Sequence, residues 1–203
     1  NLDRAYGFSI RCIKTKFSVS TANDPVVNDP SDPSTEDTIN FNGFKYKTVL
    51  SPNTGKIWLD RNLGAKRAAT SSTDTDAYGA YYQFGAAKCP VGFGVPTEAE
   101  LKAETTEATT GIKVINFDSA LKNFLQIPAA GFLNDIGNDS GPGNNPAGVG
   151  EQVAMWTKDE SVVEGGGRSL SVKNDRVNRE EVLIAKFVNS RVTTKLSVRC
   201  VKD

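Results

Sequence analysis

The stretch VPTEAELKAE, residues 95–104, contains the clearest helix start in this chain of 203 residues. Thr97 and Glu100 have the spacing of a capping box, in which each side chain accepts a hydrogen bond from the backbone amide of the other residue. Pro96 stands directly before the pair, and Pro90 ends any helix that precedes it. We therefore expect a helix to begin within this stretch and an irregular segment to lead into it.

A second helix is predicted upstream, within SSTDTDAYGAYYQFGAA, residues 71–87. Ala77, Tyr81 and Phe84 recur at positions i, i+4 and i+7, so they would share one buried helical face. The other two tyrosines would lie on the opposite, wetter face: Tyr78 and Tyr82. The residues available to cap its start are Thr73, Asp74 and Asp76.

Short strands are predicted on both sides of these helices. Upstream, FKYKTVL (44–50), the turn SPNTG (51–55) and KIWLD (56–60) are typical of a β-hairpin. Downstream, a shorter helix or turn at 118–125 precedes four predicted strands: VAMWT (153–157), RSLSVKN (168–174), VLIAKFV (182–188) and TKLSVRCV (194–201). This order predicts an α+β fold with mainly antiparallel short strands, two helices and a long irregular loop.

The composition excludes several functional classes. Lys+Arg and Asp+Glu are both 24, so the chain lacks the basic excess of a nucleic-acid-binding protein. No apolar run approaches the roughly 20 residues of a membrane span, so we expect no membrane insertion. Histidine is absent, which excludes Ser-His-Asp hydrolysis, Cys-His proteolysis and histidine-ligated metals. An enzyme built on this chain would need carboxylates, Lys, Tyr or Cys.

The two ends of the chain share a pattern. YGFSIRCIK (6–14) and KLSVRCVK (195–202) align at their cysteines, Cys12 and Cys200, with apolar residues of similar size at matching positions. Between the first copy and the predicted hairpin lies a stretch rich in Pro, Asp, Ser and Thr, which is typical of an extended linker.

Several stretches between residues 40 and 203 together carry a family pattern: FKYKTVL (44–50) with KIWLDRNLG (56–64), KCPVGFGVPTEAEL (88–101), IPAAGFLN (127–134), MWTKDES (155–161) and LSVRCVKD (196–203). In combination they resemble the Fibrobacter succinogenes major paralogous domain, a repeated module of secreted bacterial proteins. The resemblance implies a C-type-lectin-like fold, which is shared with formylglycine-generating enzymes and with ligand-binding tips of bacterial and phage adhesins.

The resemblance also implies a domain organisation. Residues 1–16 would be the terminal strand of a preceding repeat, 17–39 the linker, and 40–203 one complete repeat. The partners would then include neighbouring repeats of the same chain. An alternative remains open, in which the first strand pairs with this domain's own sheet.

The same resemblance implies roles for the cysteines. In C-type-lectin-like domains a disulfide often ties the first helical segment to the last strand, and Cys89 and Cys200 occupy those positions. Closing a loop of about 110 residues would stabilise the fold by roughly 4–5 kcal/mol in the chain-entropy model. The alternative is a pair of buried thiols. Cys12 would lack its partner, and an oxidised pair implies a secreted, extracellular or cell-surface protein.

The candidate binding region is the loop NDIGNDSGPGNNPAGVG (134–150) with the strand that follows it. Its candidate ligand-binding residues are Asn138, Asp139, Asn144, Asn145, Glu151, Trp156 and Asp159. Oxygen ligands on a flexible loop suit Ca²⁺, and the metal candidates are Asp135, Asp139, Asn145 and Glu151. C-type lectins use a W-N-D stretch here, whereas this chain has W-T-K-D. The alternatives are a loop whose residues only form turns and a Trp156 that belongs to the core rather than to a ligand-stacking surface.

These observations predict a secreted, non-catalytic ligand-binding or adhesion module of a tandem-repeat bacterial surface protein. Its ligand would be an extracellular glycan or peptide, with Ca²⁺ as the one possible cofactor. The first alternative is a structural spacer repeat without its own ligand. The second is a hydrolase that uses paired carboxylates. Oxidase chemistry of the formylglycine-generating type would need a reactive cysteine pair, and Cys89 and Cys200 are expected to be structural.

Overall fold

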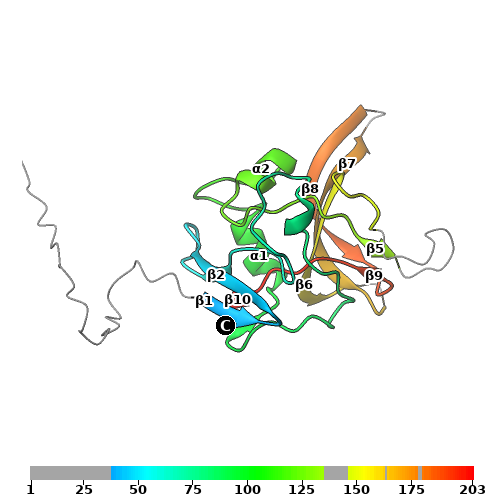
Figure 1. Ribbon diagram of the computed structural model, residues 1–203. Coiled ribbons are helices and arrows are strands. Elements are labelled where there is room, and N and C mark those ends of the chain that lie inside the picture. Colours follow the sequence, from blue (N-terminus) through cyan, green and yellow to red (C-terminus); the bar gives the residue numbers. More distant parts are fainter. Residues whose placement is uncertain (1–37, 135–145, 163, 178–179) are drawn as a thin grey trace, which may run out of the picture. The chain divides into compact units, whose positions relative to one another are not determined.

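The computed structural model describes residues 38–134, 146–162, 164–177 and 180–203, which lie in a compact unit spanning Glu36–Asp203. The described residues confirm an α+β fold in which the strands pair mostly antiparallel. Figure 1 shows the arrangement of the strands and helices. No helix among these residues is long and apolar enough to cross a membrane.

Several predictions concern residues that lie outside this described part. They are the segment 1–16, the linker as far as residue 37, and with them Cys12. The same holds for five of the candidate ligands: Asp135, Asn138, Asp139, Asn144 and Asn145. All of these remain predictions.

The predicted hairpin forms the centre of a five-stranded sheet. Its strands follow the order β1 (Thr38–Phe41), β2 (Phe44–Leu50), β3 (Ile57–Leu59), β10 (Val201–Lys202) and β4 (Phe93–Gly94). Strand β1 begins two residues inside the predicted linker. It reaches β2 through Asn42 and Gly43, whose positive φ angles of 50° and 80° suit a two-residue hairpin turn.

A second sheet contains the strands β6 (Gln152–Glu160), β7 (Gly167–Val177) and β8 (Glu180–Ser190) in that order. A further pair joins β5 (Leu133–Asn134) to β9 (Thr194–Lys195). The predicted final strand, 194–201, is divided, because each part pairs with a different partner. Leu196 pairs with Tyr82 and Ser197 with Met155, before β10 joins the first sheet.

The capping box predicted from the sequence is present at α1 (Glu98–Glu104). The Glu100 amide donates to the Thr97 hydroxyl over 3.1 Å, and the Thr97 amide donates to the Glu100 carboxylate over 2.7 Å. A similar box formed by Asn116 and Ser119 begins α2 (Phe117–Lys122). Helix α1 contacts β6 and β7 on one side. On the other, Glu104 binds Ser51 and Glu100 binds Lys56, at the two ends of the hairpin turn.

The helix predicted within residues 71–87 is wrong. Only one 3-10 turn forms, η1 (Thr75–Ala77), and irregular backbone follows. Gly79 explains the break, because its φ is +77° and a Cβ atom there would lie 2.5 Å from the Leu63 carbonyl oxygen. Tyr78 is consequently buried, at 6% exposure, instead of lying on a wet face. Asp74 precedes the turn without capping it by a side-chain hydrogen bond, and it pairs with Arg67 at 2.8 Å.

Strand β6 separates two hydrophobic clusters. Val153 and Met155 point into the cluster that contains Trp58, Leu101 of α1 and the inner face of β7. Ala154 and Trp156 point into the other cluster, which contains Tyr46 and the closing segment Leu196–Cys200. Both faces of β6 are therefore buried along residues 153–157, so packing holds this part of the strand rigidly in place.

Candidate binding pocket

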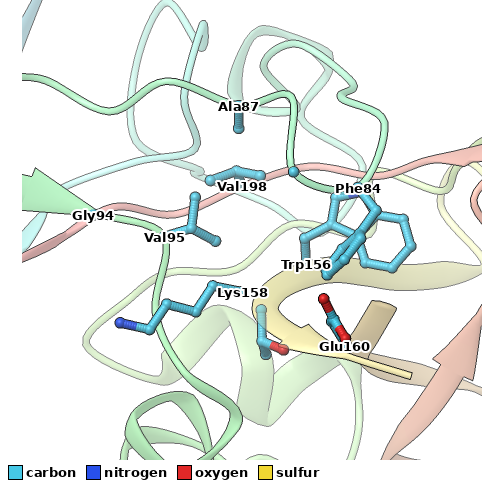
Figure 2. A pocket seen from close by; sticks show the side chains of 10 residues that line it. Phe84, Ala87, Gly94, Val95, Trp156, Lys158, Glu160 and Val198 are labelled. Atoms are coloured by element: carbon cyan, nitrogen blue, oxygen red, sulfur yellow. The ribbon is translucent and has the colours of Figure 1, made fainter. Parts of the chain in front are cut away.

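The last half of β6 borders a cavity of about 330 Å³. Figure 2 shows its lining, where aromatic and aliphatic side chains form the walls and two charged side chains lie nearby. The lining residues are Phe84, Gly85, Ala87, Gly94, Val95, Trp156, Thr157, Lys158, Glu160 and Val198. The cavity thus combines apolar walls with a small number of polar groups, as binding pockets for small ligands and side chains commonly do.

Strand β6 supplies four of the lining residues: Trp156, Thr157, Lys158 and Glu160. The pairing of β6 with β7 shifts register between Trp156 and Glu160. The intervening Asp159 instead accepts a hydrogen bond from the backbone amide of Glu98, the first residue of α1. An acidic group at this helix start is favourable, because the first helical amides have no partner within the helix.

Two interactions hold the aromatic wall. The Trp156 indole Nε1 donates to the Tyr82 carbonyl over 2.7 Å, and the Phe84 ring meets the indole edge-on with centroids 5.4 Å apart. Phe84 also lies directly over the backbone of Gly167, where a Cβ atom would approach the ring to 2.1 Å. Trp156 is 2% exposed, so it belongs to the core rather than to an open stacking surface.

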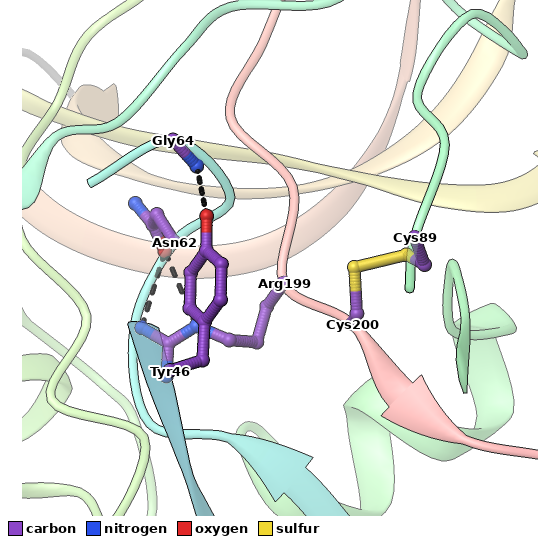
Figure 3. Close-up of a disulfide and its surroundings, with 6 residues drawn as sticks. All are labelled: Tyr46, Asn62, Gly64, Cys89, Arg199 and Cys200. Atoms are coloured by element: carbon purple, nitrogen blue, oxygen red, sulfur yellow. Dashed lines mark hydrogen bonds between the residues drawn. A yellow bond between two sulfur atoms is a disulfide. The ribbon is translucent and has the colours of Figure 1, made fainter. Parts of the chain in front are cut away.

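The opposite wall is fixed by the disulfide between Cys89 and Cys200, whose Cα atoms lie 5.9 Å apart (Figure 3). Ala87 and Val198 of the pocket each stand two residues before one of these cysteines. The Lys158 amide adds a bond of 2.8 Å to the Pro96 carbonyl, beside Val95. Covalent and hydrogen-bonded connections therefore preform the pocket.

Arg199 lies fully buried beside this disulfide. Its guanidinium donates to the Asn62 side-chain oxygen over 3.3 and 3.1 Å (Figure 3). It also donates to the Leu59 carbonyl over 3.3 Å. Burial lowers the Arg199 pKa to about 9, although the charge of Asp60 acts in the opposite direction. Among the described residues its hydrogen-bond partners are neutral oxygens, so Arg199 anchors the closing segment rather than presenting a charge to solvent.

A charged network supports the start of α1 behind the pocket. Arg168 of β7 binds both carboxylate oxygens of Glu98, at 2.5 and 3.0 Å, and Lys102 binds Glu98 at 3.0 Å. The hydrogen bond from Arg168 is the main cause that lowers the Glu98 pKa to about 2. In contrast, Lys158 and Glu160 at the pocket are exposed to solvent and available to a ligand.

Comparisons of the chain with models of known protein families, with curated proteins and with solved structures found no match in any of the three. The family resemblance therefore remains a hypothesis about fold and ligand. The function has to be inferred from the geometry of the molecule.

The predicted site residues that the structure describes lie in different places. Trp156 lines the pocket, Asp159 binds the start of α1, and Glu151 is exposed in the turn that leads into β6, where its amide donates to the Gly148 carbonyl over 3.0 Å. No cluster of three or more His, Cys, Asp or Glu side chains suited to a metal occurs within the described residues.

Several pocket residues were missed by the sequence analysis. Lys158 and Glu160 stand two and four positions after Trp156, and this closeness in the chain is the signal that could have found them. The sequence places Phe84 on a predicted helical face and gives no sign that Val95 and Val198 belong to a site. Their approach to Trp156 depends on contacts between distant parts of the chain, for which the local sequence carries no signal.

Proposed function

We propose that the chain carries an extracellular, non-catalytic recognition module of C-type-lectin-like fold, whose pocket accepts an apolar side chain of a peptide ligand. The observation that carries this proposal is the preformed apolar cavity between Phe84, Val95, Trp156 and Val198. Its volume of about 330 Å³ lies at the lower end of the range typical of ligand pockets. An aliphatic or aromatic side chain is the group of matching size and polarity.

The charges at the pocket favour a peptide over a purely apolar small molecule. Lys158 and Glu160 have opposite signs and lie two residues apart on the same strand. Together they offer a donor and an acceptor to the polar backbone that flanks a bound side chain. Such exposed charges contribute mainly to orientation and association rate, whereas burial of the apolar side chain supplies the affinity.

The composition of the lining favours binding over hydrolysis. Glu160 is the one carboxylate among the described lining residues, and it is exposed. Hydrolysis by paired carboxylates requires a second such group across the reacting bond. An extracellular location is supported by the disulfide, because such bonds persist in oxidising compartments. Calcium binding by the 134–150 loop is a separate proposal, which a titration of the chain with Ca²⁺ would test.

The decisive experiment selects peptides from a displayed random library against the full chain and measures their affinity by calorimetry. Val95→Phe, which fills the pocket, should weaken the selected peptides by about tenfold or more, since this corresponds to losing roughly 1.4 kcal/mol. Val91→Phe is the matched control, because Val91 is fully exposed outside the pocket. Failure to select any peptide, or equal affinities for both variants, would support the spacer function instead.

A further inference from the structure

A second cavity, of about 260 Å³, lies against the other end of the β6–β7–β8 sheet. Its lining is mostly hydroxyl, amide and cationic: Phe132, Gln152, Ala154, Ser169, Ser171, Lys173, Val188, Asn189, Ser190, Arg191, Thr194 and Leu196. We call this cavity the serine groove. It shares no lining residue with the proposed peptide-binding pocket, so the two cavities are separate.

The alternation of β7 builds the floor of the serine groove. Leu170 and Val172 point into the hydrophobic core, so Ser169, Ser171 and Lys173 occupy the opposite face. Two consecutive positions on this face are serines, whose side chains are short. The result is a floor of small hydroxyl groups on which a ligand can lie close to the strand.

The serine hydroxyls lie deep within this floor. Ser169 is 1% exposed, and its Oγ lies 2.8 Å from the Oγ of Ser190 at the end of β8. Ser171 is 3% exposed. Its hydroxyl therefore lies in the floor of the serine groove rather than on an open surface.

Cations stand near both ends of the serine groove. Lys173 lies six residues beyond Gly167 along β7, and Gly167 pairs with Ser190, the neighbour of Arg191. At roughly 3.3 Å per residue, six residues correspond to about 20 Å of strand. Neither cation forms an ion pair with a described residue, and no carboxylate is present among the described lining residues. Within the part of the chain that the structure describes, the groove therefore offers two cations and no carboxylate above a polar floor.

We propose that the serine groove binds an acidic polysaccharide, with ligand carboxylates or sulfates at Lys173 and Arg191 and sugar hydroxyls over Ser169 and Ser171. The spacing of Lys173 and Arg191 along the sheet suits a polymer that reaches both cations rather than a single ion. Hydroxyl and amide side chains match the alternating donors and acceptors of sugar hydroxyls. This binding requires neither Ca²⁺ nor the peptide pocket.

The test measures binding of the full chain to polygalacturonate and to heparin by calorimetry, in EDTA. Neutral dextran and poly-glutamate serve as comparison ligands. We expect binding to at least one acidic polysaccharide, weakened about tenfold or more by Lys173→Gln with Arg191→Gln, and weakened further by added salt because exposed charge pairs are screened. Heparin binding without polygalacturonate binding would identify sulfate as the recognised group.

Matched variants separate this proposal from the peptide pocket. Lys158→Gln removes a cation beside the other cavity and should leave polysaccharide affinity unchanged, as should Val95→Phe. Ser171→Val should weaken the polysaccharide even though it leaves both cations in place. Equal binding of dextran, tighter binding of poly-glutamate, or unchanged affinity in the double variant would each overturn the proposal.

Discussion

The indole nitrogen of Trp156 donates a hydrogen bond of 2.7 Å to the backbone carbonyl of Tyr82, 74 positions earlier in the chain. This bond attaches the pocket's aromatic wall to the segment that carries Phe84. The same carbonyl also accepts from the Leu196 amide over 3.0 Å, so one backbone oxygen joins β6, the Tyr82 segment and the closing segment. Trp156 consequently connects core packing to the proposed binding function.

Replacing the two tryptophans should have different effects on stability. Trp58 is fully buried, but its Nε1 has no hydrogen-bond partner among the described residues. Trp156→Phe removes a real hydrogen bond, whereas Trp58→Phe removes an unsatisfied donor. We expect Trp156→Phe to lose about 1–2 kcal/mol more of the free energy of unfolding than Trp58→Phe. Urea unfolding of both variants measures this difference, and equal losses would contradict the assigned role of the Trp156 bond.

Reduction of the Cys89–Cys200 disulfide should destabilise the fold strongly. The cysteines are separated by 111 positions, and a loop of that size corresponds to about 4–5 kcal/mol of chain entropy in the unfolded state. We expect the midpoint of urea unfolding to fall accordingly in the Cys89→Ala, Cys200→Ala double variant. Peptide affinity should fall as well, because Ala87 and Val198 lose their shared anchor. A double variant as stable as the parent would show that the closing segment is held without the disulfide.

Stability should decrease in acid partly through Glu98. Its pKa is about 2 in the folded protein against an ordinary value of 4.5, because Arg168 and Lys102 hydrogen-bond its charged form. The unfolded state then binds more protons as the pH falls, so the contribution of Glu98 is complete above about pH 5 and lost towards pH 2.

Glu98→Gln should therefore flatten the decline of unfolding free energy between these pH values, measured by urea titration at each pH. Some decline will remain through Glu100, whose pKa is also about 2. Burial raises the pKa of Glu100, but hydrogen bonds from Lys56 and Thr97 outweigh it. Glu107→Gln is the control, since that side chain is 66% exposed and lies 4.0 Å from Lys102. Identical pH profiles for Glu98→Gln and the parent would refute this origin of the acid sensitivity.

Gly167 and Phe84 should behave as a coupled pair. A Cβ atom at Gly167 would approach the Phe84 ring to 2.1 Å, so Gly167→Ala must displace the ring that forms one wall of the pocket. We expect Gly167→Ala to weaken peptide binding by about tenfold and to destabilise the fold by roughly 1–3 kcal/mol, as overpacking usually does. Phe84→Ala removes the obstruction. The double variant should therefore lose less stability than the two single changes combined, and simple additivity would contradict the contact.

Local signals in the sequence predicted the local structure well. The Thr97–Glu100 capping box and the hairpin of β2 and β3 depend on residues close together in the chain, and both are confirmed. The helix within residues 71–87 failed because periodicity cannot register that Gly79 packs against the Leu63 carbonyl. Residues 194–201 were predicted as one strand because alternation does not reveal that β5, Tyr82, Met155, β3 and β4 pair with different parts of it.

The candidate site was predictable only in part, for a related reason. Trp156 was identified, but its pocket is completed by Phe84, Val95 and Val198, which long-range contacts bring together. Asp159 was expected to bind a ligand and instead binds the start of α1, which the capping pattern of that helix does not reveal.

The central claim is that the Phe84–Trp156 pocket is the peptide-binding site, and methyl NMR of the full chain tests it most directly. Titration with a selected peptide should shift the methyl signals of Val95 and Val198, which line the pocket. The methyls of Val188, in the serine groove, should not move. Shifts at Val188 with unchanged Val95 and Val198 would contradict the account.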